Sequence, residues 1–473
     1  MTAPLYDALL KYVKRGTVPF HMPGHKQGKV LPKKYVENLA KIDLTELPGL
    51  DNLHNPEGPI LEAERLLAQA FGSKEAFFLV NGSTAGIYAS MYAVLNPGDR
   101  VLVMRNSHKA VYNGIVLTHS IPFYLLPEID YENGIAMGID VRKLEDVLQK
   151  ERDVKAVVVT YPNYYGFCSD IQKIVDIVHK YGKILIVDEA HGAHFPFSED
   201  LPLSSIKAGA DIVIQSLHKT LTSFTQTSVL HLNSERVDVD RLRYSLSLFQ
   251  STSPSYILMS SIDLAREYME KEGNEQLQKV IQLASYVRKE IDNIEGIRCL
   301  GEDIVGKYGV VDFDVTKLTI SVKNLGINGA EAEEFLREEC NIQIEMFDMF
   351  NILAMITVGD DERSIGRLLE GLKRLSKNKR KEVSIKRMEG FPSLPEMVFI
   401  PSEAIIKSKK KVNFMEAEGS VAGDFVIPYP PGVPILSPGE RIEKDVVKYI
   451  EVLYNKGIKI LGIQNNLLSV CEI

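Results

Sequence analysis

Short runs of apolar, often β-branched residues recur through the first half of the chain. These runs lie at 76–80, 100–105, 122–126, 156–162, 183–190, 211–216 and 228–232. Most of them are separated by segments with helical spacing of apolar residues, such as the one from Thr84 and the one that stops at Gly182. Continuously apolar strands that alternate with helices predict an α/β domain with a mainly parallel, seven-stranded sheet covered on both faces.

The pattern changes near Pro254, where long, charged amphipathic helices begin. The runs at 318–322 and 351–359 predict strands of a smaller α+β unit, and the charged run at 377–387 predicts a solvated boundary. The proline-rich stretch at 427–440 could be a stiff linker, but its strand-like and helical flanks favour a folded C-terminal α+β unit. We therefore expect four parts, an N-terminal arm, a large domain, a small domain and a C-terminal domain, at 1–50, 51–255, 256–376 and 388–473.

Composition narrows the class of protein. A chain of 473 residues exceeds what one core usually supports, and a net charge of −8 argues against a nucleic-acid partner. The four cysteines are far apart and form no CxxC pair, so we expect neither a disulfide framework nor a metal site. We expect the protein to lie in a reducing cytoplasm. The start of the chain lacks a signal-peptide core and no run of 18 apolar residues exists, so no membrane association is expected.

Polar residues follow several of the predicted strands, and ligands of open α/β sheets collect at that edge. After the first strand come Gly82, Ser83 and Thr84, directly before a helix. A glycine turn, hydroxyl groups and free N–H groups at a helix start suit a phosphate. Taken alone, such a segment is more often an ordinary helix cap.

Three further strands end in titratable residues. His108 follows the second strand, where a histidine is usually structural. Asp188 ends an entirely apolar strand, so it is either a cap or salt-bridge partner, or the partner of a protonated heterocycle nitrogen. Lys219, in the segment SLHKT, follows the next strand. A strand-end lysine is commonly a surface residue, but desolvation would lower the pKa of its amine and free a lone pair for attack on a carbonyl.

Together these clusters supply a phosphate cradle, an aromatic ring, a buried acid and an amine, which is the set of groups that pyridoxal phosphate requires. Asp188 precedes Lys219 by 31 residues, which leaves room for one helix and one strand, so both can face one crevice. The sequence therefore predicts that Lys219 binds pyridoxal phosphate through its amine and that Asp188 keeps the ring nitrogen protonated.

Eight segments resemble, in the same order, those of the ornithine/lysine/arginine decarboxylase family of fold-type-I pyridoxal-phosphate enzymes. They are HMPGHKQG (21–28), ELPGLDNLHNPEGPI (46–60), VNGSTAGI, RNSHKAV, DEAHGAHF, SLHKTL, QSTSPSY (250–256) and IPYPPGVPILSPGE (427–440). DEAHG is shared with α-oxoamine synthases, whereas HMPGHK together with the proline-rich tail is more specific. Because HMPGHK begins at residue 21, the chain resembles the short form that lacks an N-terminal wing domain.

The resemblance implies a homodimer whose active sites lie at the interface, and it assigns a role to each matching residue. Ser83, Thr84, Ser216 and His218 would hold the phosphate, and His108 would stack on the pyridine ring. Asp188 would bind the ring nitrogen, and His191 would reach the phenolic oxygen. Ser251 and Thr252 would reach the phosphate bound by the partner subunit.

The reaction implied is decarboxylation of a basic L-amino acid. Arginine is favoured, giving agmatine for polyamine synthesis, while lysine to cadaverine and ornithine to putrescine stay open. Candidate acids for the substrate side chain, each of which could equally be a surface acid, are Glu345, Asp348, Glu416, Glu418 and Asp424. The alternatives are another fold-type-I reaction, namely aminotransfer, acyl transfer or β-elimination, and a non-catalytic regulatory homologue.

Overall fold

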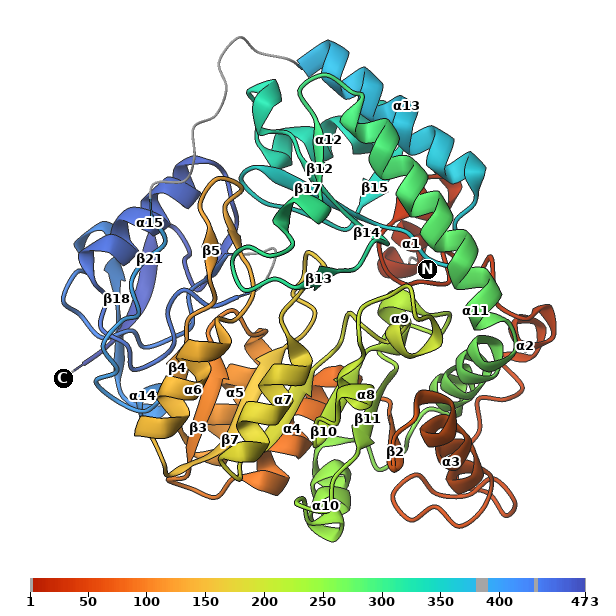
Figure 1. Ribbon diagram of the computed structural model, residues 1–473, viewed down its shortest axis with the longest axis horizontal. Coiled ribbons are helices and arrows are strands. Elements are labelled where there is room, and N and C mark those ends of the chain that lie inside the picture. Colours follow the sequence, from red (N-terminus) through yellow and green to blue (C-terminus); the bar gives the residue numbers. More distant parts are fainter. Residues whose placement is uncertain (1–2, 380–389, 429–432, 473) are drawn as a thin grey trace.

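A seven-stranded sheet forms the centre of the computed structural model, which describes residues 3–379, 390–428 and 433–472 (Figure 1). Its strand order is β2-β11-β10-β9-β7-β3-β4; β11 is antiparallel to both of its neighbours, and all other neighbouring pairs are parallel. The strands are β2 (Glu75–Leu79), β3 (Arg100–Met104), β4 (Ile121–Leu125), β7 (Val154–Thr160), β9 (Ile184–Asp188), β10 (Ile212–Gln215) and β11 (Ser228–Leu232). The predicted mainly parallel, seven-stranded sheet is confirmed.

Helices cover both faces of this sheet because its strands are apolar on both sides. Successive residues of β3 belong to different hydrophobic clusters: Leu102 packs in one and Val103 in the other. One cluster includes residues of α3 (Pro59–Phe71), α6 (Val141–Lys150) and α7 (Ile171–Lys180). The other includes residues of α4 (Gly82–Val94), α5 (Lys109–Thr118) and α10 (Val239–Phe249).

A smaller unit with its own core follows the long helix α11 (Tyr256–Asp292), drawn in green in Figure 1. Its antiparallel sheet has the order β12-β14-β17-β16, with β12 (Arg298–Leu300), β14 (Lys317–Ser321), β17 (Asn351–Met355) and β16 (Met346–Phe347). Its core also includes residues of α12 (Gly329–Glu339) and α13 (Glu362–Lys379). The early strand β1 (Val18–Phe20) pairs with β15 (Ile342–Ile344), so the start of the chain is built into this unit.

The C-terminal part forms another small α+β unit, drawn in blue beside the β3–β4 end of the large sheet (Figure 1). It contains α14 (Pro401–Ile406), α15 (Lys444–Asn455), and the strand pairs β18 (Lys409–Asn413) with β21 (Leu467–Cys471) and β19 (Ile427–Pro428) with β20 (Ile460–Leu461). The predicted boundary at 377–387 and the proline-rich stretch at 427–440 lie partly outside the described residues. The exact domain limits therefore stay predictions.

Short elements connect these parts. They are α1 (Pro4–Lys14), α2 (Lys33–Asn38), α8 (Ser205–Ala208), the hairpin β5 (Ile129–Asp130) with β6 (Ile135–Ala136), and the pair β8 (Phe167–Cys168) with β13 (Asp312–Phe313). The four cysteines are buried free thiols. Among the helices that the structure describes, none combines the length and the apolar character needed to cross a membrane.

Candidate active site

Lys219 lies on a single helical turn, α9 (Leu217–Thr220), at the carboxyl end of β10, between the large sheet and the small unit (Figure 1). The early segment HMPGHK packs directly on this turn. Gly24 N–H donates to the carbonyl of His218 at 2.8 Å, and a Cβ atom on Gly24 would lie 2.3 Å from the carbonyl oxygen of Leu221. Glycine is required here because the two backbones approach too closely for any side chain.

Lys26, in the same segment, is a buried structural cation. Its amine forms an ion pair with Asp360 at 3.3 Å and donates to the carbonyls of Pro19 at 3.0 Å and Met355 at 2.9 Å. Burial lowers the pKa of Lys26, and the charge of Asp360 raises it again. The motif HMPGHK therefore joins the small unit to the turn that presents Lys219.

Asp188 is a buried carboxylate beside that turn. It ends β9, pairs in register with Ile214 of β10 and is 4% exposed. Its Oδ1 accepts a hydrogen bond from Ala190 N–H at 3.2 Å, and no cation within the described ranges forms an ion pair with it. Burial lowers the pKa of Lys219, and the negative charge of Asp188 opposes that shift. Because β9 and β10 are adjacent and parallel, Asp188 and the turn that carries Lys219 lie at the same edge of the sheet.

Three serine hydroxyls meet where α4 begins. Ser83 Oγ lies 2.6 Å from Ser216 Oγ and donates to Ser228 Oγ at 3.0 Å. Gly82 has φ +75° at the helix start, and the side chain of the N-cap residue Asn81 accepts from no N–H group of the helix. Thr84 lies in the same first turn. This end of the crevice offers hydroxyl and backbone donors suited to a phosphate.

Two further histidines border the crevice. His108 is an exposed N-cap of α5, whose Nδ1 accepts from Ala110 N–H at 3.2 Å, and the charges of Asp188 and Lys219 act on its ring. His218 directs Nδ1 toward the carbonyl of Thr227 at 2.7 Å, so Nδ1 is the donor, and burial lowers its pKa to about 4. The neutral His218 ring thus has only an acceptor at Nε2, and its predicted role as a phosphate donor would need a protonated ring.

Ser251 and Thr252 are exposed, and they lie beside the start of α4 in their own chain. Ser251 N–H donates to Asn81 Oδ1 at 3.2 Å, and the carbonyl of Ser251 contacts His54 Nε2 at 2.8 Å. Their predicted contact with the partner subunit stays a prediction.

A lysine that the sequence did not single out completes the site. Lys317, the first residue of β14, is 1% exposed, and its amine lies 2.6 Å from His191 Nδ1. The opposite ring nitrogen of His191, Nε2, lies 3.1 Å from the amine of Lys219. The ring of Tyr164 packs on His191 with centroids 4.4 Å apart. A lysine at the start of a strand has no sequence signal that distinguishes it from a surface residue.

The five acids proposed for the substrate side chain lie in different settings. Glu345 accepts from Tyr164 Oη at 3.1 Å and from Met22 N–H at 2.9 Å, and its charge acts on Lys219. Asp348 is buried and already accepts from Tyr165 Oη at 2.7 Å and from several donors at 350–351. The remaining three, all exposed on the C-terminal unit, are Glu416, Glu418 and Asp424. Glu345 is the acid that combines proximity to Lys219 with a carboxylate that few donors occupy.

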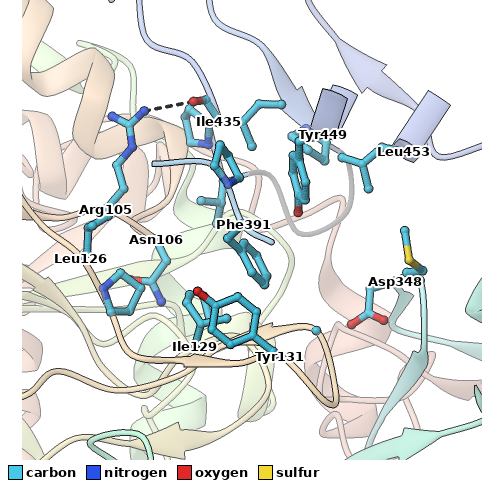
Figure 2. Close-up of a pocket in the computed structure, with 18 of the residues that line it drawn as sticks. Arg105, Asn106, Leu126, Ile129, Tyr131, Asp348, Phe391, Ile435, Tyr449 and Leu453 are labelled. Atoms are coloured by element: carbon cyan, nitrogen blue, oxygen red, sulfur yellow. Dashed lines mark hydrogen bonds between the residues drawn. The ribbon is translucent and has the colours of Figure 1, made fainter. Parts of the chain in front are cut away.

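A cavity of about 350 Å³ lies where the three units meet. Figure 2 shows the rings of Tyr131 and Phe391 next to each other in its lining, with Asp348 and Tyr449 at one end and Arg105 at the other. Most of its lining is apolar or aromatic, and Tyr164 belongs both to this lining and to the surroundings of Lys219. The cavity therefore adjoins the crevice.

These residues fit pyridoxal phosphate on their own chemistry. A buried carboxylate without a cationic partner among the described residues is costly, and a protonated ring nitrogen would supply that partner. An amine of lowered pKa lies beside it, and hydroxyl and N–H donors lie beyond. Lys219, Asp188 and the Ser83 cluster would hold the ring through its aldehyde, nitrogen and phosphate.

The comparisons with known proteins agree over nearly the whole chain. The model of the Orn/Lys/Arg decarboxylase major domain matches residues 3–364, and that of the C-terminal domain matches 382–469. Arginine decarboxylases of Bacillus anthracis and Bacillus subtilis are 38% and 37% identical, each over 99% of this chain and 97% of the relative. The structure of lysine decarboxylase A from Pseudomonas aeruginosa matches with a TM-score of 0.81 at 22% identity, over 99% of this chain and 80% of that chain. This likeness confirms the predicted fold class.

Proposed function

The chain belongs to the Orn/Lys/Arg decarboxylase family and is a decarboxylase of a basic amino acid, and from this premise we propose that its substrate is arginine and its cofactor pyridoxal phosphate bound to Lys219. The product would be agmatine, a precursor for polyamine synthesis. The matching arginine decarboxylases share 37–38% identity with this chain, whereas the lysine decarboxylase of Pseudomonas aeruginosa shares 26%.

One observation carries the assignment of the cofactor. Asp188 and Lys219 lie at the carboxyl ends of the adjacent strands β9 and β10, and Asp188 opposes the shift that burial causes in the pKa of Lys219. An amine beside a buried carboxylate, next to a cluster of hydroxyl donors, supports a carbonyl cofactor with a basic ring nitrogen and a phosphate.

Each residue of the site has a separate role in the proposed decarboxylation. The chemistry that pyridoxal phosphate supplies when bound is an electron sink for the pair left at Cα when carbon dioxide departs. Asp188 keeps a proton on the ring nitrogen, because its buried negative charge stabilises that cation. Lys219 Nζ or a ring nitrogen of His108 returns a proton to Cα. His108 and His191 border the crevice from two sides, and burial keeps the His191 ring neutral by lowering its pKa well below the usual range.

Glu345 is our candidate for the acid that binds the guanidinium group. Its carboxylate lies between Tyr164 and the HMPGHK segment, and it is close enough to raise the pKa of Lys219. A planar carboxylate suits the two-point hydrogen bonding of a guanidinium better than the single ammonium of lysine.

We further propose a cytoplasmic homodimer. Helix α1 presents Leu5, Leu9 and Val13 to solvent at 75%, 56% and 58% exposure, and Ser251 and Thr252 are exposed beside the phosphate cradle. An apolar helix face at the surface is typical of an interface. Sedimentation analysis of the purified chain tests the dimer. Mixing Lys219→Ala chains with chains that carry Ser251→Ala and Thr252→Ala tests the shared site, because hybrid dimers would regain one intact site.

The deciding experiment incubates the protein, supplied with pyridoxal phosphate, separately with arginine, lysine and ornithine. Carbon dioxide and the amine are both measured. We expect agmatine from arginine to form fastest, no turnover in Lys219→Ala, and unchanged turnover in Lys207→Ala, which removes an exposed lysine of the same unit. Faster release of cadaverine or putrescine would contradict arginine as the substrate, and release of a keto acid or ammonia would contradict decarboxylation.

A further inference from the structure

The ring of His191 lies between two lysine amines. Lys317 Nζ is 2.6 Å from Nδ1, and Lys219 Nζ is 3.1 Å from Nε2. The three side chains come from different elements, since Lys317 begins β14, His191 follows β9 and Lys219 lies on α9. The large and small units are therefore linked through one imidazole at the candidate active site.

Counting protons shows that the two amines cannot both be ammonium groups in these contacts. A neutral imidazole has one N–H donor and one acceptor nitrogen, and an imidazolium has no acceptor. An ammonium can only donate. Two ammonium groups would need two acceptor nitrogens on His191, so one lysine must be a neutral amine that accepts the imidazole N–H.

The contacts identify Lys317 as the ammonium. Its amine has two acceptors, His191 Nδ1 and the carbonyl of Tyr164 at 3.4 Å. Its contact with His191 is the shorter one, as expected of a charge-assisted hydrogen bond. Lys219 has His191 Nε2 as its single hydrogen-bond partner among the described residues.

We propose that Lys317 is a positioning residue that fixes His191 as the Nε2–H tautomer, so that His191 donates to Lys219 and keeps its amine neutral and nucleophilic. Lys317 thus acts, through His191, on the Lys219 amine that binds the carbonyl cofactor, and Lys317 itself does not contact that amine. This inference rests on the proposed role of Lys219, and it assigns a function to a buried lysine that the sequence did not reveal.

The backbone around Lys317 is fixed, as the role requires. Gly166, at φ +94°, leaves room for the lysine stem, because a Cβ atom there would lie 3.0 Å from Lys317 Cβ. Thr319 Oγ1 donates to the carbonyl of Tyr165 at 3.0 Å, and Arg288 donates to the carbonyls of Val315 and Lys317. The backbone from which the Lys317 side chain reaches His191 is therefore held in place.

The charged groups around this trio come from every neighbouring element. Those that act on Lys317 are Asp314, Glu345 and Lys219, and those that act on His191 are Lys219, Lys317, His108 and His218. Those that act on Lys219 are the carboxylates of Asp188 and Glu345, which favour its charged form, so the neutral amine depends on the hydrogen bond from His191. Burial lowers the pKa of Lys317 to about 8, which leaves it largely protonated at pH 7, and lowers the pKa of His191 well below its usual range. A neutral His191 beside a charged Lys317 agrees with the proton count.

The test measures the reactivity of the Lys219 amine directly, without turnover. Full-length protein is freed of bound carbonyl cofactor with hydroxylamine and labelled with trace acetic anhydride between pH 6 and 10. Mass spectrometry of the Lys219 peptide gives the midpoint of its titration. In Lys317→Met, His191 is free to turn a lone pair toward Lys219 and stabilise its ammonium form. We expect the midpoint to rise by about one pH unit, which lowers the neutral fraction near neutral pH about tenfold.

Three variants separate this role from packing and from direct repulsion. Lys317→Arg keeps a cationic donor and should keep the wild-type midpoint, and Lys323→Met, which removes a lysine on the same unit bound to Glu132, should also keep it. In a His191→Phe background, Lys317→Met should add no further shift. Lys317→Leu replaces the methionine variant if the latter does not unfold cooperatively.

The outcomes each decide the question. A midpoint that rises in Lys317→Met but not in Lys317→Arg, and no longer responds once His191 is removed, supports the proposal. An unchanged midpoint in Lys317→Met, an equal shift in Lys317→Arg, or a shift that persists without His191 overturns it. None of these results depends on carbon dioxide release, so failure here leaves the proposed decarboxylation standing, and the reverse also holds.

Discussion

Arg105 and Glu440 form a buried, two-point ion pair between the large unit and the C-terminal unit. Arg105 Nη1 lies 2.6 Å from Glu440 Oε1 and Nη2 lies 2.8 Å from Oε2, across 335 residues of chain. The guanidinium also stacks near Tyr124, 4.5 Å from the ring centroid, and donates to the carbonyl of Ile435 (Figure 2). This pair explains why both RNSHKAV and the PGE at the end of the proline-rich motif carry charged residues.

Glu440→Gln should therefore loosen the C-terminal unit. Removing one partner leaves an uncompensated buried charge, which costs about 3–5 kcal/mol. Denaturant unfolding should show this loss, while Glu396→Gln, which removes the exposed partner of Arg441, should cost about 1 kcal/mol or less. Equal effects of the two changes would contradict a structural role for the buried pair.

Lys26→Met should destabilise the protein for the same reason. It leaves Asp360 buried and unpaired, with an expected cost of about 3–5 kcal/mol in the free energy of unfolding. The matched control is Lys29→Met, because Lys29 faces the neighbouring Asp361 in an exposed pair at 3.9 Å and should contribute little. Thermal unfolding of both variants measures the difference, and a stable Lys26→Met protein would refute this account of HMPGHK.

Asp188→Asn should retain bound cofactor yet turn over slowly. The amide keeps the shape of the side chain but loses the charge that stabilises a protonated ring nitrogen, so kcat should fall on the order of 10²-fold. Cofactor absorbance and agmatine release are measured together. Asp176→Asn, which changes an exposed aspartate on α7, serves as control, and undiminished turnover in Asp188→Asn would count against the proposed pairing.

Glu345→Gln and Asp348→Asn should have different effects. Loss of the charged hydrogen bond that Glu345 accepts from the guanidinium should raise the KM for arginine by about 10- to 100-fold. Asp348 is already satisfied by protein donors, so its change should lower the free energy of unfolding more than it alters KM. Steady-state kinetics with arginine and unfolding curves separate the two roles, and the reverse pattern would move the substrate site to the cavity in Figure 2.

Glu64 gives the folded protein a dependence on pH. Burial raises the pKa of Glu64 to about 8, against 4.5 for the free group, although Phe78 N–H donates to it at 2.9 Å. Between these values the folded state holds a proton that the unfolded state has lost, so stability falls as pH rises, by up to about 1.4 kcal/mol per pH unit. Glu64→Gln removes this loss. Unfolding at pH 5 and pH 8 should show its advantage over wild type growing with pH.

The seven strands were predictable because each is apolar along its length and separated by helical or polar segments. Their order was not, because the apolar run of β11 does not reveal that it runs antiparallel between β2 and β10. The length of a strand was also hard to judge. The predicted run at 351–359 stops being a strand after Met355, where the chain turns toward Asp360 and its partner Lys26.

The candidate site was partly predictable by the same logic. Ser83, Asp188 and Lys219 follow strands directly, and the carboxyl ends of neighbouring strands in a parallel sheet meet at one edge. Lys317 and Lys26 could not be found this way. Both are buried cations, and a sequence gives no sign that a lysine will meet acceptors inside a protein instead of water.

The close fit between Gly24 and the turn that holds Lys219 has a consequence for biosynthesis. Gly24 and Lys26 are synthesised early. Their contacts with the turn after β10 and with Met355 form only after those later segments have been synthesised. Capture of a coloured cofactor would therefore act as a signal of completed assembly, since the amine gains its surroundings only after distant parts of the polypeptide have come together.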